Sequence, residues 1–141
     1  TAESCTGGLL AQSITDIPGS SLWFDRGFVT YSNESKVDCL EISPLTLDAY
    51  GAVSQETANE MAVGAIASGS GNLSISISGI AGPDGGSKSK PVGTVFFAIS
   101  NKKSIIFNYH ANFPGDRSMI RDKAVLFILN TLLKLTLSPQ I

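Results

Sequence analysis

The stretch Thr-Ala-Glu-Ser-Cys-Thr-Gly-Gly at residues 1–8 opens the chain and runs directly into the apolar Leu9-Leu10-Ala11. Small hydroxyl and thiol residues followed by two glycines, at the start of a helical pattern, predict a sharp turn from a strand into a helix. The first N–H groups of a helix have no partner within it, so such a turn suits an anion. With Ser4 at the apex, its hydroxyl lies beside the N–H groups of the next residues, Thr6, Gly7 and Gly8. This arrangement can attack a carbonyl and hold the oxyanion, although a plain helix cap is the alternative interpretation.

The composition indicates one globular domain spanning residues 1–141. The chain is 43% hydrophobic and 16% charged, and this length buries a sizeable core without disulfide or metal support. Because the first residue already lies within a motif, we expect residues upstream to form a strand that leads into it. A formal net charge of −2 leaves no basic stripe for a phosphate backbone, so we expect no nucleic-acid partner.

Cysteine and histidine are too few for a metal site or a disulfide framework. Cys5 and Cys39 show no metal-ligand spacing, and His110 is the single histidine. We therefore expect no metal, no cofactor and a reduced, cytoplasmic protein. The longest apolar run, residues 124–129, is too short to cross a membrane.

Apolar spacing predicts helices interleaved with strands. Helices are expected at about 8–15, 36–40, 44–50 and from a Ser54 cap to about 66, with a last helix after the Pro114-Gly115-Asp116 break. Aromatic and β-branched residues predict strands at 22–31, 73–77, 92–100 and 104–113, the first followed by a polar loop at 32–35 and the last two forming a hairpin. This order indicates an α/β fold with helices on both faces of a mixed sheet. The apolar stretch from Ala124 to Leu133 is either deeply buried or a homodimer contact.

A glycine-rich loop follows the strand at 73–77. Residues 78–95 contain five glycines and two prolines, and loops of this length in a compact domain are usually functional. Residues 82–89 nearly match a phosphate-binding Gly-x-x-x-x-Gly-Lys-Ser loop. That motif opens a helix, whereas Pro91 and a β-rich run follow here, so we reject nucleotide hydrolysis by this route.

Several separated motifs together resemble the C-terminal domain of the competence/damage-inducible protein CinA. They are Ala2 to Gly8, Phe28 to Asn33 with Lys36, Gly51 to Ser54, Ser78 to Val95, and Gly115 to Arg117. The resemblance runs essentially from end to end, and it implies a further strand and helix before Thr1. It implies a three-layer αβα domain that hydrolyses the carboxamide of nicotinamide mononucleotide in pyridine-nucleotide salvage, with Ser4 and Lys36 as the catalytic pair and no metal. Many members of the family carry threonine where this chain has Ser78, so a hydroxyl is kept.

The residues themselves leave lysine as the candidate base. A serine nucleophile needs a base, and His110 lies in a predicted strand with no visible partner. Lys36 would have to lose its proton, which burial favours by lowering its pKa. Cys5 is the rival nucleophile, but alternation sends Ser4 and Cys5 to opposite sides of an extended segment.

Residues for substrate binding come from the same motifs. Arg117 and Arg121 lie four apart at the start of the last helix, where guanidinium groups suit a phosphate. The remaining candidates are Thr6, Gly7, Gly8, Tyr31, Gly82 and Pro83, while Ser78 is expected to relay the proton or hold the tetrahedral intermediate. A non-catalytic module that binds and senses a pyridine nucleotide is the alternative function.

Overall fold

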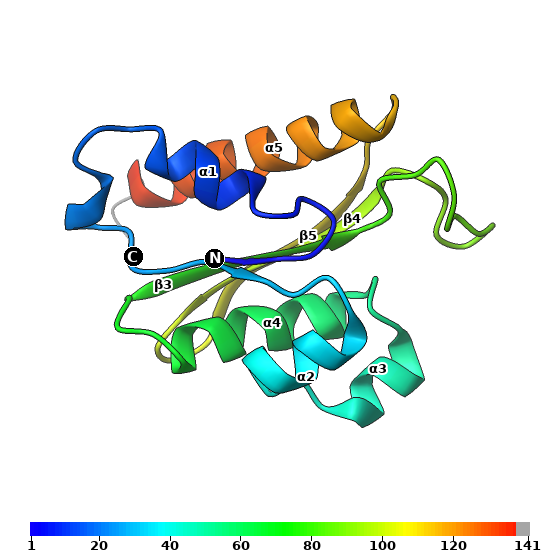
Figure 1. Cartoon of the computed structure of the whole chain (residues 1–141), viewed down its shortest axis with the longest axis horizontal. Coiled ribbons are helices and arrows are strands. Elements are labelled where there is room, and N and C mark those ends of the chain that lie inside the picture. Colours follow the sequence, from blue (N-terminus) through cyan, green and yellow to red (C-terminus); the bar gives the residue numbers. More distant parts are fainter. Residues whose placement is uncertain (138–141) are drawn as a thin grey trace.

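The computed structural model describes residues 1–137, which form one mixed five-stranded sheet between two layers of helices (Figure 1). Its order is β2-β1-β3-β4-β5. The strands are β1 (Ala2–Glu3), β2 (Phe28–Val29), β3 (Leu73–Gly79), β4 (Thr94–Asn101) and β5 (Ile105–Asn112). Strand β1 lies between β2 and β3 and is parallel to both, whereas β4 is antiparallel to β3 and β5. The predicted mixed sheet is confirmed. Residues 138–141 of the expected domain lie outside the described part of the chain.

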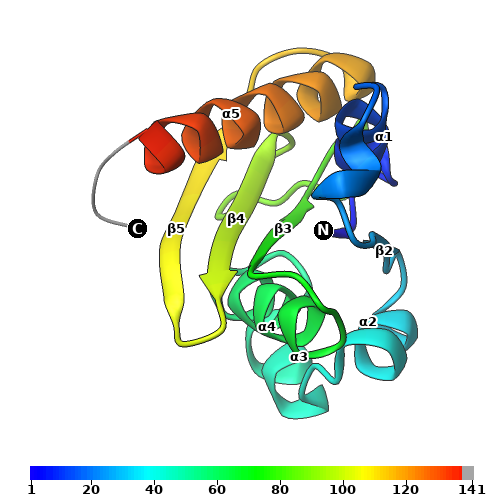
Figure 2. The ribbon, with the colours of Figure 1, turned by 90° about the vertical axis from the view of Figure 1, so that its left-hand side faces the viewer.

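Helices cover both faces, so the three-layer architecture is also confirmed. Helices α1 (Leu9–Thr15) and α5 (Arg117–Leu137) lie on one face. Helices α2 (Asn33–Leu40), α3 (Pro44–Tyr50) and α4 (Gln55–Ala67) lie on the other, as the second view also shows (Figure 2). The sheet therefore separates two cores. One contains Ile75, Ile77 and Phe97 of the sheet, beneath α1 and α5, and the other is formed by Leu40 of α2 and Met61 of α4 against Ala2.

Strand β3 fits α4 through hydroxyl groups rather than large apolar side chains. Ser74 Oγ donates to the Ala62 carbonyl at 2.6 Å, and Ser76 Oγ donates to the Ala58 carbonyl at 2.5 Å. Alanines at these points of α4 leave room for the helix to lie close on the sheet. Gly64 extends the close approach to α2, because a Cβ there would lie 2.0 Å from the Leu40 carbonyl oxygen.

The predicted strand at 22–31 is wrong except for Phe28 and Val29. Residues Ser20–Leu22 form a 3₁₀ turn, and the side chains of Leu22 and Trp23 are 90% and 62% exposed. A strand needs a paired neighbour, and the neighbour of β2 is the two-residue β1.

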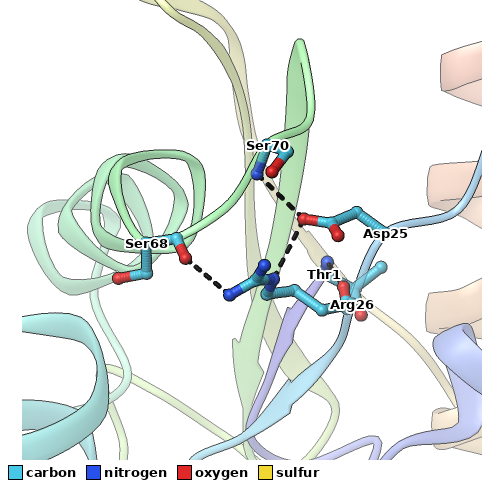
Figure 3. Close-up of polar contacts among 5 residues, drawn as sticks. All are labelled: Thr1, Asp25, Arg26, Ser68 and Ser70. Carbon is cyan, nitrogen blue, oxygen red and sulfur yellow. Dashed lines mark hydrogen bonds and ion pairs between the residues drawn. The ribbon is translucent and has the colours of Figure 1, made fainter.

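Polar contacts hold the segment before β2 instead (Figure 3). Asp25 Oδ2 accepts a hydrogen bond from the Ser70 N–H at 2.9 Å, and Arg26 Nη1 donates to the Ser68 carbonyl at 2.7 Å. The Ser70 N–H, followed by the Arg26 side chain, lowers the pKa of Asp25. These contacts attach the segment to the turn between α4 and β3.

Helix α2 begins at Asn33 rather than at Lys36. The polar run at 32–35, predicted as a loop, is its cap and first turn. Ser32 Oγ accepts from the Ser35 N–H at 3.0 Å, and Ser35 Oγ accepts from the Ser32 N–H at 3.2 Å. This reciprocal capping places Lys36 on the face of the helix that meets the sheet, where it is buried.

The last helix is partly core and partly exposed. Ile120, Ala124, Val125 and Ile128 are buried, whereas the side chains of Leu126 and Leu133 are 61% and 56% exposed. Within residues 1–137, no helix has the length and apolarity to cross a membrane.

Candidate active site

Ser4 lies at the carboxyl end of β1, on the side of the sheet that faces α2. The register pairs Ala2 with Ser76 and Glu3 with Ile77, and the Ser4 N–H continues the pairing with the Ile77 carbonyl at 2.9 Å. Successive side chains alternate between faces. Ala2 therefore enters the core beneath α2 and α4, Glu3 faces α1, and Ser4 faces α2 again. Carboxyl ends of parallel strands are the usual location of sites in such sheets.

Lys36 reaches Ser4 from α2. Its Nζ lies 3.1 Å from Ser4 Oγ and donates to the Thr30 carbonyl at 2.8 Å. The side chain is 1% exposed, so this amine is almost completely removed from water. The end of β1 at Ser4 and the segment from Thr30 to Lys36, which are far apart in the sequence, thus meet at one buried nitrogen.

Burial lowers the pKa of Lys36, because an ammonium loses its hydration in the protein interior. No carboxylate among residues 1–137 forms an ion pair with it; the ion pair in this part of the chain joins Asp25 and Arg26. A lysine in these surroundings gives up its proton more readily than an exposed one. Its amine can then accept a proton from the adjacent hydroxyl.

Cys5 points away from this site. Its side chain belongs to the apolar core on the α1 and α5 face, and burial raises the pKa of its thiol to about 12. A thiolate is the reactive form of cysteine, so a buried thiol with this pKa is a poor nucleophile. The predicted separation of Ser4 and Cys5 onto opposite faces is confirmed.

The turn after Ser4 differs in one respect from the prediction. Its Gly7 N–H is not free, because it donates to the Ser4 carbonyl at 3.0 Å and closes a tight turn. The N–H groups of Thr6 and Gly8 have no acceptor in the described part of the chain, so they remain available as donors. Both Gly7 and Gly8 have positive φ angles, 59° and 98°, which glycine adopts without strain.

Ser78 lies next to Ser4 on the neighbouring strand, at the register position that follows Ile77. It is fully buried, and its Oγ donates to the Ala52 carbonyl at 2.6 Å. With its hydrogen engaged in this way, the hydroxyl oxygen can still accept a hydrogen bond.

Arg117 brings three of the predicted binding residues together. As the first residue of α5, it donates from Nη1 to the Gly82 carbonyl and from Nη2 to the Tyr31 hydroxyl, each at 2.7 Å. Pro83 follows Gly82 through a cis peptide bond and is exposed. The guanidinium, itself exposed, thus connects the end of the β2 segment with the glycine-rich loop.

Arg121 contacts the backbone of the turn that follows Ser4. Its Nη2 donates to the Thr6 carbonyl at 3.1 Å, and its Nε is buried with no partner in the described chain. Arg121 therefore contacts a residue two positions after Ser4, a contact that its spacing of four residues from Arg117 does not predict.

Two residues of the site were missed by the sequence analysis. Thr30 contributes its carbonyl to Lys36, and backbone groups leave no signal in the sequence. Glu3 is 0% exposed and accepts three hydrogen bonds, although it was noted only as part of a motif. The sequence signal for Glu3 is a charged residue between the small residues Ala2 and Ser4 at the end of a strand. Buried carboxylates are rare, so this position could have been noticed as unusual.

Other features of the molecule lie away from Ser4. A hollow of about 900 Å³ is lined by residues including Ile14, Trp23 and Leu73 near the amino ends of β1 and β3. His110 is exposed on β5, with its ring beside Phe96. Within the described residues, no group of three or more His, Cys, Asp or Glu side chains could hold a metal ion.

Comparisons with known proteins identify related chains along nearly the whole length. The CinA C-terminal domain family matches residues 1–136. The nicotinamide-nucleotide amidohydrolase PncC of Enterobacter agglomerans is 53% identical over 133 residues, which cover 94% of this chain and 81% of that protein. PncC of Escherichia coli strain K12 is 52% identical over 132 residues, covering 94% and 80%.

Solved structures show the same fold. A competence/damage-inducible protein from Agrobacterium tumefaciens superposes with a TM-score of 0.93 at 43% identity, over 96% of this chain and 82% of that one. A CinA-superfamily protein from Escherichia coli gives 0.90 at 40% identity, over 95% and 77%.

The buried lysine should make stability depend on pH. Because the pKa of Lys36 is lowered in the folded state, the unfolded chain holds more protons between that pKa and the ordinary value of 10.5, so stability rises with pH there. Below both pKa values the contribution of Lys36 to stability does not change with pH.

The unfolding free energy of the wild type relative to Lys36→Met should therefore rise with pH. Urea titrations from about pH 6 to 10 measure this, with the exposed Lys102→Met as the matched control. A flat difference would contradict the lowered pKa.

Proposed function

Because the chain belongs to the CinA C-terminal domain family, we propose that it is an amidohydrolase that converts nicotinamide mononucleotide and water into nicotinate mononucleotide and ammonia. The names of relatives at 52–53% identity support this substrate. The observation that carries the chemistry is the buried Lys36 amine 3.1 Å from Ser4 Oγ. The proposed reaction needs neither a metal nor a cofactor and would serve pyridine-nucleotide salvage.

In the first half of the proposed reaction, Ser4 is the nucleophile and Lys36 the base. Lys36 accepts the hydroxyl proton as Ser4 Oγ bonds to the carboxamide carbon, giving a tetrahedral intermediate. The C–N bond then breaks, and Lys36 returns the proton to the departing nitrogen, which leaves as ammonia. An ester between Ser4 and the nicotinoyl group remains.

Water completes the reaction with the roles repeated. Lys36 accepts a proton from water as its oxygen attacks the ester carbon, and the proton passes to Ser4 Oγ as the C–O bond breaks. The product is a carboxylic acid, which ionises, and the free serine is restored. One water is consumed for each ammonia released.

The developing negative charge needs donors close to Ser4. The Thr6 and Gly8 N–H groups, which have no acceptor within residues 1–137, are suited to hold the oxyanion, whereas the Gly7 N–H is engaged by the Ser4 carbonyl. Since the hydrogen of Ser78 is directed to the Ala52 carbonyl, its oxygen suits an acceptor role in the proton relay beside Ser4.

The arginines and the loop around them are the proposed binding site for the nucleotide part. Arg117 joins Tyr31 to Gly82 and still has N–H groups for a phosphate, and Pro83 continues this surface. Arg121 supports the turn through the Thr6 carbonyl and adds a positive charge near Gly7.

A second function, that of a non-catalytic module binding a pyridine nucleotide, is favoured by one comparison. The chain is 47% identical to part of a putative competence-damage inducible protein of Caldicellulosiruptor saccharolyticus but covers 32% of it. Domains of this family therefore occur inside longer proteins, where a sensor role is an alternative. Release of ammonia by the purified protein, over a panel of nicotinamide mononucleotide, its riboside, nicotinamide and the dinucleotide, separates the two functions.

The exposed apolar residues of α5 support a homodimer. Leu126, Leu133 and Leu137 are 61%, 56% and 75% exposed, and a second copy of the chain would cover them. Light scattering at micromolar protein should report about twice the chain mass of 14.8 kDa. A measured mass equal to that of one chain would contradict the homodimer and would mean that these leucines are exposed in the free protein.

Ser4→Ala should lower the rate of ammonia release by roughly three orders of magnitude or more, because it removes the nucleophile. Cys5→Ala should keep most activity, since this thiol lies in the opposite core. In the wild type, kcat/KM should rise with pH as Lys36 loses its proton, with an apparent pKa below the ordinary lysine value. Turnover retained in Ser4→Ala and lost in Cys5→Ala would identify Cys5, and not Ser4, as the nucleophile.

Arg117→Ala should raise KM for the mononucleotide about 10- to 100-fold, the effect of losing a hydrogen bond to a charged group. The riboside, which carries no phosphate, should be affected much less. Arg26→Ala is the matched control, because Arg26 contacts Ser68 and Asp25 far from Ser4. Equal losses on both substrates would remove phosphate recognition from Arg117.

A further inference from the structure

The side chain of Glu3 is a fully buried carboxylate beside the proposed nucleophile. It faces α1, on the opposite side of the sheet from Lys36. Its Oε1 accepts from Thr6 Oγ1 at 2.7 Å and from the Leu10 N–H at 2.8 Å, while Oε2 accepts from the Ala11 N–H at 3.0 Å. Burying a carboxylate is costly unless hydrogen bonds replace its hydration, and here three donors do so.

Two of these bonds serve the helix, and the third serves the turn. Helix α1 has Gly8 as its N-cap and no side-chain cap of its own, so Glu3 takes the free N–H groups of Leu10 and Ala11. Thr6, by contrast, precedes the helix. Its bond to Glu3 adds nothing to helix capping and instead fixes the turn that begins at Ser4.

Thr6 is held from two sides. Its hydroxyl donates to Glu3, and its carbonyl accepts from Arg121 Nη2 at 3.1 Å and from the Leu9 N–H at 3.0 Å. Ser4 lies between Glu3 and Thr6 in the chain, and its carbonyl accepts the Gly7 N–H. The backbone that carries the Ser4 hydroxyl is thus enclosed by the contact of Glu3 with Thr6, named here the Glu3–Thr6 clasp.

We propose that Glu3 is a positioning residue for the reaction, acting through Thr6 to hold Ser4 Oγ against Lys36 Nζ. This inference rests on the proposed function and assigns no direct chemistry to Glu3, which contacts neither Lys36 nor Ser4 Oγ. Displacing a reacting group by about 1 Å can cost roughly 100-fold in rate. Loosening the clasp should therefore lower kcat more than it changes KM.

The molecule contains a matched control for this carboxylate. Glu60 accepts from the Ser43 N–H at 2.8 Å and from Thr46 Oγ1 at 2.5 Å, so it also binds a backbone N–H and a threonine hydroxyl at a helix start. That helix is α3, and neither contact involves the turn after Ser4. Glu60→Gln reproduces the chemical change of Glu3→Gln at a site remote from the nucleophile.

The experiment compares kcat, KM and urea stability for Glu3→Gln, Thr6→Val, Thr6→Ser and Glu60→Gln. Glu3→Gln and Thr6→Val should lower kcat about 10- to 100-fold with KM changed less than about threefold. Thr6→Ser, which keeps the hydroxyl, should recover most of the loss seen in Thr6→Val. Glu60→Gln should lose stability but keep kcat. Wild-type kcat in folded Glu3→Gln and Thr6→Val, or an equal loss of kcat in Glu60→Gln, would overturn the positioning role.

A substrate-independent measurement keeps this test separate from the proposed function. A fluorophosphonate reacts with activated serine hydroxyls, and intact mass spectrometry gives its rate of addition to Ser4. The rate should fall in Glu3→Gln and Thr6→Val but not in Glu60→Gln. If the wild type released no ammonia, the proposed function would fail, and these rates alone would decide the role of Glu3. Equal labelling rates in all variants, or no labelling of wild-type Ser4, would overturn the positioning role of Glu3. If Glu3→Gln did not fold, the two Thr6 variants would give the answer.

Discussion

Side-chain alternation along residues 2–5 is the constraint on which the rest of the structure depends. The pleat sends Ala2 and Ser4 toward α2 and α4, and Glu3 and Cys5 toward α1 and α5. A shift of one residue would exchange the two sets, placing the thiol beside Lys36 and the carboxylate in an apolar core. The short β1 escapes such a shift because parallel neighbours hold it on both edges.

Burial of Lys36 costs stability and, in the proposed mechanism, favours reactivity. Removing an ammonium from water costs free energy, and no carboxylate in residues 1–137 offsets the charge. The Thr30 carbonyl and Ser4 Oγ supply hydrogen bonds but leave the pKa lowered. The same burial that weakens the fold raises the fraction of the amine that is unprotonated at a given pH, which is the form that the proposed mechanism needs. Functional sites commonly carry such a cost, which the surrounding cores must offset.

Polar groups, rather than large apolar contacts, set the geometry on both sides of Ser4. On the α4 side, Ser74, Ser76 and Ser78 donate to backbone carbonyls at intervals of two residues along β3. On the α1 side, the Glu3–Thr6 clasp satisfies the start of a helix and the turn before it. Hydrogen bonds are directional, so they restrict orientation more tightly than apolar packing of the same area. Ser4, the proposed nucleophile, lies between these two arrangements and has little freedom to move.

The sequence by itself determined the helices, the hairpin, the α/β class and the turn at Ser4, because spacing, caps and glycines are local signals. It failed at residues 22–31, where aromatic residues favour a strand but the two-residue β1 offers too little pairing. It also placed Ser32 to Ser35 in a loop, although their side chains cap α2 reciprocally. Only the tertiary structure decided which charged residues are buried. Glutamate and lysine are usually exposed residue types, but Glu3 is covered by the helix that follows its own strand, and Lys36 meets Ser4 across 32 residues of sequence. The contact of Lys36 with Ser4 depends on strand order and register, which no local pattern encodes.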